Sequence, residues 1–466
     1  MPFDASVTPA PSRFSNEVRQ LWRLAFPIAI AQAGQAMMGL VDTLVVGRAG
    51  TEALAAAGLG NNLYFAVSSF GMGLMMGFDP LLSQALGAGN PGRARELLRQ
   101  AAWMALFAGM ALCALLWWVP DALHWIPRME PQVIEQVRAY MLWRAPGVPL
   151  MLAFMAARSY LQANANPRPL VVATVVANIC NFLFDLLLVF GGARLPEWCG
   201  PLRRIPAMGV EGAALATLLC TGVQLLIIMA AVRRMQVPPG TRASWKPVWA
   251  DIFQGGKLGT PIGLHIAAEV GVFSLASLLA ATLGKAEVGA HQIAISYASL
   301  TFTVAVGVGN AGSVRVGWAV GARDTPQARL SGFVAFASGA AFMSLMGLGF
   351  AVFPEQLGAL SGAPPEVLTL LMPLLVVSAV FQVFDGIQGV GAGVLRGAGE
   401  TRFTFIANMV GHYFIGLPLT LLLGFHLGLG LWGIWWGLCA GLVFVALALL
   451  WRFNRVSAGT LVPVEA

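Results

Sequence analysis

Residues Ala85–Arg95 read ALGAGNPGRAR, and residues Ala319–Arg329 read AVGARDTPQAR. The two stretches lie 234 residues apart, and the same offset places Pro27 on Pro261. Similar matches at this offset occur through much of the chain. The sequence therefore predicts two copies of one structural unit.

The chain is strongly apolar. Hydrophobic residues make up 58% of the 466 positions and charged residues 11%, whereas a soluble domain carries about 25% charged residues. Apolar stretches long enough to cross the roughly 30 Å hydrocarbon core recur along it, and helices pair their backbone groups internally in lipid. We therefore predict an all-α integral membrane protein with twelve transmembrane helices. The predicted spans are about 21–46, 54–80, 97–119, 137–161, 169–190, 209–232, 257–283, 288–314, 331–353, 366–392, 404–425 and 429–451.

The repeat divides these spans into two lobes. We predict an N-terminal segment (1–20), a six-helix lobe (21–232), a linker (233–256), a second six-helix lobe (257–452) and a tail (453–466). Because each half crosses the membrane an even number of times, both halves enter and leave on the same side. The two lobes are thus expected to be related by a parallel internal repeat, with a central cavity between them.

Lysine and arginine residues gather in the loops on one side of the predicted topology. By the positive-inside rule this side is cytoplasmic, so both termini of a multi-pass protein of the cell inner membrane should be cytoplasmic. This asymmetry explains the net charge of +7 without any binding of nucleic acid. The loops of this side contain Arg93, Arg95, Arg99, Arg168, Arg233, Arg234, Arg242, Lys246, Arg323, Arg329, Arg402, Arg452 and Arg455.

A duplicated membrane half is typical of secondary transporters, in which the substrate path lies between the repeats. The G-x-x-x-x-G-K-[ST] pattern of ATP-binding loops does not occur in the sequence. The five cysteines are scattered and form neither a disulfide framework nor a metal-binding pattern. We predict a transporter rather than an enzyme, with no cofactor and no use of ATP, for which a monomer suffices. A membrane enzyme would instead need clustered metal-binding acids or a nucleophile beside a base, and neither is found.

Four acids lie deep inside predicted spans, where an ionised group costs roughly 3 kcal/mol or more. In the first lobe, Asp42 is joined by Asn178, Asn181 and Asp185 on one helix and by Thr217 on the next. Carboxylate, amide and hydroxyl oxygens suit a hard cation or a proton exchanged between acids. A network of hydrogen bonds that only packs the helices is the alternative.

The second lobe contains Glu269, one turn after His265, and Asp385, flanked by Gln382 and Gln388. The 234-residue offset does not pair the four deep acids with one another, which favours different tasks in the two lobes. Nearer one end of the membrane, Asp79 fits equally a salt bridge, with Arg315 as a candidate partner, and an ion site. The candidate residues of the substrate cavity are Gln32, Gln35, Met38, His265, Gln292, Gln382 and Gln388.

The sequence resembles the multidrug and toxic compound extrusion (MATE) family, in its bacterial NorM-like branch. The resemblance covers about Leu21 to Arg452, on motifs such as Val41-Asp42-Thr43 and Leu395-Arg396-Gly397. It implies twelve helices in two bundles that export bulky, often cationic drugs, driven by inward Na⁺ or H⁺.

The resemblance also implies roles for individual residues. Asp42, Asn181, Asp185 and Thr217 match the family's cation or proton site in the first lobe, and Glu269 and Asp385 match its coupling acids in the second. The chain departs from the family at Ser361-Gly-Ala-Pro-Pro365, where the family often carries an acid.

The expected mechanism is antiport by alternating access, with organic cations and drugs as substrates and membrane lipid as the surroundings. The main rival is a lipid-linked precursor flippase of similar two-lobe build. A flippase should line its cavity with cationic residues that hold a pyrophosphate, whereas the deep acids predict an acid-rich cavity.

Overall fold

The structure is a computed structural model that describes residues 13–48, 50–125, 131–194, 197–236 and 245–464. These residues form helices and connecting loops, and no strand occurs among them. Most of the predicted N-terminal segment (1–12), part of the linker (237–244) and the last two residues of the tail lie outside the described residues.

The first half contains eight α-helices: α1 (Arg13–Gly47), α2 (Thr51–Met76), α3 (Phe78–Gly87), α4 (Pro91–Ala122), α5 (Pro131–Arg144), α6 (Gly147–Ala163), α7 (Arg168–Phe190) and α8 (Val210–Arg234). The short 3₁₀ turns η1 (Leu123–Trp125), η2 (Gly192–Arg194) and η3 (Glu197–Arg204) lie in its loops. The second half contains α9 (Trp249–Leu283), α10 (Lys285–Gly321), α11 (Thr325–Val352), α12 (Pro354–Ser361), α13 (Pro365–Gly397), α14 (Thr401–Met409), α15 (Leu417–Leu421) and α16 (Gly430–Ala458). Two π-helical turns, η4 (Val410–Gly416) and η5 (Leu422–His426), flank α15.

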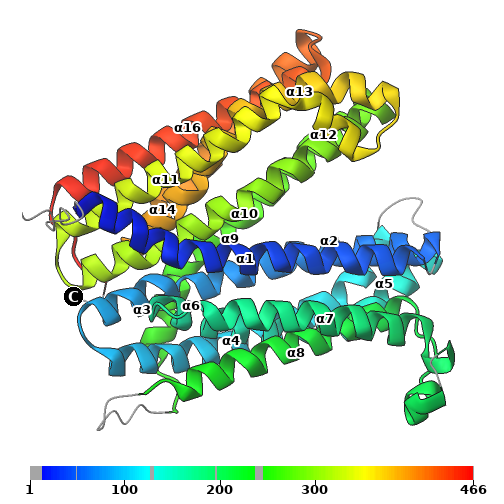
Figure 1. Cartoon of the computed structure of the whole chain (residues 1–466), viewed down its shortest axis with the longest axis horizontal. Helices are drawn as coiled ribbons and strands as arrows, with labels where there is room; N and C mark the ends of the chain where they lie inside the picture. The colour runs from blue at the N-terminus through cyan, green and yellow to red at the C-terminus, as the bar shows by residue number, and fades with distance from the viewer. Residues whose placement is uncertain (1–12, 49, 126–130, 195–196, 237–244, 465–466) are drawn as a thin grey trace, which may run out of the picture.

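Eleven helical segments of the described chain are long and apolar enough to cross a membrane. The twelfth pass consists of α5 and α6, which follow one another from one end of the molecule to the other (Figure 1). They are separated at Pro146, whose ring removes a backbone donor and interrupts the helix. The prediction of twelve spans in an all-α membrane protein is confirmed.

Helices α1 and α9 begin before the apolar stretches that revealed them. The first helix starts at Arg13, and α9 starts at Trp249, inside the range predicted as linker. Hydropathy marks only the part of a helix that lies in lipid, so it underestimates a helix whose first turns are polar. Helix α9 therefore extends into the end of the range predicted as linker.

The helices form two lobes that meet at the end bearing the C-terminus and diverge toward the end bearing α5 and α12 (Figure 1). Helix α1 packs against α7 of the first lobe and α10 of the second, while α2 packs against α9. Apolar side chains fill separate cores on the two sides, one centred on α4–α6 and others on α10–α16. The molecule is therefore joined at one end and open at the other.

The two copies of the repeat share backbone details. Gly89 and Arg323, at equivalent positions, both adopt left-handed conformations, with φ of 71° and 57°. The next residues, Asn90 and Asp324, cap the following helices by accepting a hydrogen bond from the backbone N–H three residues later, at 2.9 and 3.0 Å. The parallel internal repeat is thus confirmed in the local structure.

These same segments bring the two lobes into backbone contact. A Cβ on Gly87 would lie 2.1 Å from the Trp318 carbonyl oxygen, and one on Gly321 would lie 2.0 Å from that of Gln84. Gln84 and Trp318 are themselves related by the 234-residue offset. The crossing of α3 and α10 therefore lies at the axis that relates the two halves of the protein. Small residues permit such close crossings of helices in membranes.

Gly87→Ala should destabilise the protein by roughly 1–3 kcal/mol, because its methyl group overpacks this crossing. The change would be measured as a lower Tm of the purified protein in detergent. Gly222→Ala is the matched control, since a Cβ there has no neighbour within 4 Å among the described residues. An unchanged Tm for Gly87→Ala would contradict a tight crossing.

Candidate functional site

A cavity of about 600 Å³ lies between the two lobes. Helices α1, α2, α5, α6 and α8 line it from one side, and α9, α10, α13 and α14 line it from the other. Five methionines form part of its wall and provide a flexible, polarizable surface that adapts to ligands of different shape; they are Met38, Met72, Met76, Met151 and Met155. The predicted site residues that line the cavity are Gln32, Gln35, Met38, Asp42, Thr217, His265, Glu269 and Gln388.

Beside the cavity, α1, α7 and α8 bring together the predicted polar residues of the first lobe. The Thr217 hydroxyl donates to Asp42 Oδ2 at 3.2 Å. The carboxyl group of Asp185 is close enough to that of Asp42 for the two to interact electrostatically. Asp185 and Asn181 are both fully buried. Asn178 donates to the Gly34 carbonyl oxygen at 3.0 Å, which ties α7 to α1. The sequence therefore identified a real cluster, of which Asp42 and Thr217 reach the cavity.

Several polar atoms of this cluster are buried without a hydrogen-bond partner among the described residues. They include Asp42 Oδ1, Asn178 Oδ1, both oxygens of Asp185, and both amide atoms of Asn181. A network that served only to pack helices should satisfy such atoms, because each buried polar group left unpaired is costly. Most of these atoms are oxygens, so the chemistry of the cluster fits a hard cation or a proton.

The second lobe holds a separate cluster around Glu269. His265 Nε2 lies 3.3 Å from Glu269 Oε2 and 3.1 Å from the side-chain nitrogen of Asn408. Gln388 donates to Glu269 Oε1 at 3.2 Å. Asp385 is buried and within interaction range of Glu269. The structure thus brings the two predicted acids of this lobe together, with Glu269 at the cavity surface and Asp385 behind it.

Two candidate cavity residues lie elsewhere. Gln292 is exposed on α10 and does not line the cavity. Gln382 is buried, donates to Thr301 Oγ1 at 2.6 Å and does not line the cavity either. Neither side chain lines the cavity seen here, because position along a helix does not give the direction in which a side chain points.

Two residues of the second cluster were not recognised from the sequence. Asn408 contacts His265, and His412 lies on the π-helical turn η4. In the described part of the chain, neither ring nitrogen of His412 has a hydrogen-bond partner. Turns of π-helix often occur at functional sites, but they have no clear signature in a single sequence.

The expected acid-rich cavity is a further correction. Arg144, Arg158 and Arg396 line the cavity together with Asp42 and Glu269. The depth of the four acids in their spans predicted the acids of the cavity but not its arginines. Arg144 and Arg158 both fall inside the predicted span 137–161, which was the available signal.

The partner predicted for Asp79 was also wrong. Asp79 Oδ2 lies 3.1 Å from Arg396 Nε, and Arg315 pairs with Glu17 instead. The difference arises because α3 meets α13 as well as α10 at the joined end of the lobes.

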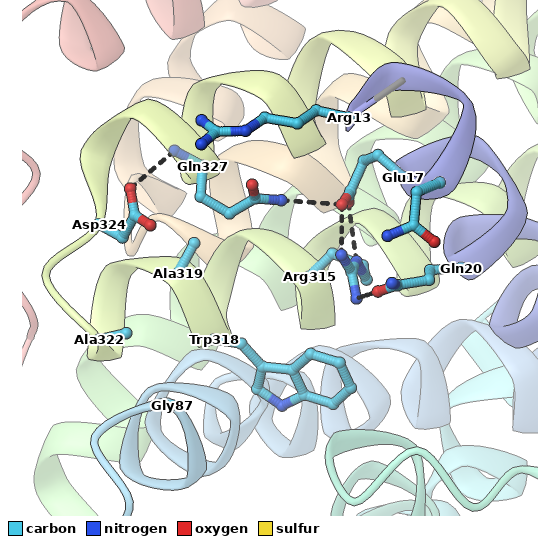
Figure 2. Close-up of a pocket in the computed structure, with 11 residues that line it drawn as sticks. Arg13, Glu17, Gln20, Gly87, Arg315, Trp318, Ala319, Ala322, Asp324 and Gln327 are labelled. Atoms are coloured by element: carbon cyan, nitrogen blue, oxygen red, sulfur yellow. Dashed lines mark hydrogen bonds and ion pairs between the residues drawn. The ribbon is translucent and has the colours of Figure 1, made fainter. Parts of the chain in front are cut away.

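Glu17 anchors the start of α1 to the second lobe (Figure 2). Its carboxylate accepts hydrogen bonds from Arg315, from Gln327 at 2.8 Å and from Ser331 at 2.7 Å. Arg315 also donates to Gln20 at 2.6 Å. This buried acid is therefore fully paired, in contrast to Asp42 and Asp185, which have oxygens without a hydrogen-bond partner among the described residues.

An equivalent contact occurs on the other side of the repeat axis. Asp251 on α9 accepts two hydrogen bonds from Arg93 on α4, at 2.7 and 2.8 Å. The 234-residue offset relates Glu17 to Asp251 and Arg93 to Gln327. We call these two contacts the closed-end clasps. These contacts were not predicted from the sequence. The 234-residue offset does relate Glu17, near the start of α1, to Asp251, near the start of α9, and this was the available signal.

Two six-helix lobes around a central cavity, with buried acids in each lobe, define a polytopic membrane transporter. A family model described as MatE matches residues 27–187 and 261–422, one stretch in each lobe. The chain belongs to the MatE family, whose members are membrane transporters rather than enzymes.

Relatives match over nearly the whole chain. It is 34% identical over 465 residues to "Probable multidrug resistance protein NorM" of Mesorhizobium japonicum, covering 97% of each chain. It is 30% identical to "Multidrug resistance protein PmpM" of Pseudomonas aeruginosa, covering 95% of this chain and 92% of that one.

Solved structures show the same fold. The MATE transporter VcmN of Vibrio cholerae in its bent form has a TM-score of 0.84 at 20% identity, covering 96% of this chain and 98% of that one. The eukaryotic MATE transporter AtDTX14 has a TM-score of 0.81 at 20% identity with the same coverage.

Glu17→Gln and Asp251→Asn should each loosen the joined end of the lobes, because each weakens a buried, charge-assisted contact worth about 1.5–3 kcal/mol. Spin labels at Arg168→Cys and Arg402→Cys, two exposed positions related by the offset, would report longer inter-lobe distances. The labels require a background in which the five native cysteines are replaced. Asp121→Asn is the control, because its exposed partner Arg138 lies in the same lobe. Unaltered distances in both clasp variants would show that the clasps do not hold this end together.

Proposed function

We propose that this chain is a multidrug efflux antiporter of the NorM-like kind, which exchanges inward Na⁺ or H⁺ for outward drugs by alternating access. It would work in the inner membrane of a bacterium, with both termini in the cytoplasm. The names of its relatives support multidrug resistance as the biological role. The coupling mechanism rests on the polar clusters of the two lobes.

The observation that carries the proposal is the set of oxygens around Asp42 and Asp185 that have no hydrogen-bond partner in the described part of the chain. A cation or proton bound there would supply the missing interactions of these buried groups. It would shift the balance between two states of the transporter only if it binds one state more tightly. The clusters connect with the cavity through Asp42 and Glu269, so ion binding can alter the charge that a drug meets.

A cationic drug would be attracted to the ionised acids of the cavity and released when they are neutralised. The membrane potential supplies roughly 2.3 kcal/mol per 100 mV for each net positive charge moved inward, so it assists the exchange only when more positive charge enters with the ion than leaves with the drug. The drug and the coupling ion therefore compete for the same negative charge, which gives antiport rather than symport.

The arrangement of the lobes supports alternating access. The cavity lies between lobes that are clasped at the end bearing the C-terminus. By the positive-inside rule this end is cytoplasmic, so this state would correspond to an outward-facing transporter. Release of the clasps and closure at the other end would expose the cavity to the cytoplasm.

The three cavity arginines are the observation that favours the flippase alternative. Two of the three, however, are already engaged by a carboxylate or an aromatic ring of the protein, and only Arg158 lacks such a partner among the described residues. Arg396 is paired with Asp79, and the Arg144 guanidinium lies 3.7 Å from the centre of the Tyr64 ring. Asp42 and Glu269 in the same cavity would repel a multiply charged anion. We therefore retain drug–cation antiport.

Efflux of a fluorescent organic cation from proteoliposomes tests the proposal, with inward Na⁺ and H⁺ gradients imposed separately. The wild type should respond to one gradient, and Asp42→Asn or Glu269→Gln should reduce coupled efflux by about 10-fold or more, since each loses a charged partner of the ion or drug.

Asp121→Asn, an acid exposed at the end of α4, is the matched control and should transport normally. Wild-type efflux from a well-folded Asp42→Asn protein would remove Asp42 from the mechanism. No response of the wild type to either gradient would contradict antiport and favour the flippase.

A further inference from the structure

The floor of the cavity, next to the joined end of the lobes, has the opposite polarity to the acid clusters. Arg158 on α6 and Arg396 on α13 both line the cavity. The Gly397 carbonyl oxygen, adjacent to Arg396, accepts a hydrogen bond from Gln84 across the lobes at 3.0 Å. These arginines therefore mark the place where the cavity ends and the inter-lobe contact begins.

Arg158 is a buried cation that forms no ion pair within the described residues. Only 8% of its surface is exposed, and its contact with Gln32 Oε1 is 3.5 Å long, at the limit for a hydrogen bond. Its Nε has no hydrogen-bond partner among the described residues. A buried guanidinium without a counter-charge is costly, so an anion here would offset a real penalty.

The surrounding groups do not provide that anion. Asp79 lies behind the cavity surface and is paired with Arg396, although Arg158 also feels its charge. One carboxylate thus serves two guanidinium groups, which leaves the floor of the cavity positive. Arg396 also donates to Asn310 Oδ1 at 2.7 Å, and this orients the Asn310 amide.

Asn310 adds a second unused donor. It lines the cavity, is 4% exposed, and its Nδ2 has no acceptor in the described part of the chain. The unused groups of Arg158 and Asn310 are both donors, whereas Asp42 and Gln388 of the same cavity have unused oxygens. The floor of the cavity therefore presents unused donors, while the walls present unused acceptors on Asp42 and Gln388 together with unused donors on Arg144 and Gln224 among the described residues.

We propose that Arg158, Arg396 and Asn310 form an anion-binding subsite that takes the carboxylate of a zwitterionic, amphiphilic substrate. The planar guanidinium fork matches a carboxylate through two parallel hydrogen bonds. The cationic group of the same molecule would face Asp42 or Glu269, and its apolar body would lie against the methionines. This inference rests on the proposed function, because it names a substrate class for the same cavity.

Tetramethylrhodamine and its methyl ester provide matched probes, since they differ only in whether the carboxylate is free. Binding of each to the full-length protein in phosphatidylcholine nanodiscs would be measured by fluorescence anisotropy, without any ion gradient. The wild type should bind the free acid more tightly than the ester. Arg158→Gln should weaken binding of the acid by roughly 10-fold and leave the ester within about 2-fold, as expected for loss of a charge-assisted contact.

Two further variants sharpen the result. Arg158→Lys keeps the charge but loses the fork, so the acid should lose affinity by a smaller factor. Arg168→Gln removes an exposed arginine that does not line the cavity and should change neither affinity. If Arg158→Gln does not fold, the wild-type preference for the acid and the Arg158→Lys series decide the question.

Equal binding of acid and ester by the wild type would overturn the subsite, as would equal weakening of both probes in Arg158→Gln. Because no gradient is needed, this outcome is distinct from failure of antiport. A protein that prefers the acid but shows no gradient-driven efflux would retain the subsite and lose the antiport proposal.

Discussion

The backbone contact between α3 and α10 is the constraint on which the rest of the structure depends. Gly87 and Gly321 bring the two helices together with no side chain between them at these points. This contact joins the lobes at one end, so that they can diverge only toward the other. The clasps at Glu17 and Asp251 lie on either side of it and add charged hydrogen bonds between the lobes. The central cavity follows from this arrangement, because both lobes contribute walls to the space that opens beyond the crossing.

The buried charges fall into two groups that differ in how well they are paired. Glu17 and Asp251 have partners across the lobes and serve to hold a conformation. Asp185 and Arg158 are equally buried yet lack such partners among the described residues. A buried group that stays unpaired costs stability and is retained where it meets a ligand or changes partners. This difference separates charges that maintain the fold from those that we assign to ion and substrate binding.

Much of the candidate site could be predicted because an ionisable residue inside an apolar span is conspicuous in a sequence. Asp42, Asp185, Glu269 and Asp385 were recognised in this way. Gln292 and Gln382 do not line the cavity, because hydropathy gives the depth of a residue and not the face of the helix that it occupies. Arg158 lay inside a predicted span, but the role that we propose for it rests on the lack of a counter-charge among the described residues, which only the packing of several helices reveals. Asn408 and His412 were not assigned to the site from the sequence, since their significance comes from the helices beside them.

By itself, the sequence determined that the chain is a helical membrane protein built from two copies of a six-span unit. It could do so because apolar runs and an internal repeat are local properties, readable without knowing which helices touch. Only the tertiary structure decided which charged groups meet. Asp79 pairs with Arg396 and Arg315 with Glu17, because the crossing of helices hundreds of residues apart sets these distances. The polarity of the cavity was decided in the same way, since each helix presents one face to it and turns its other charges into the protein.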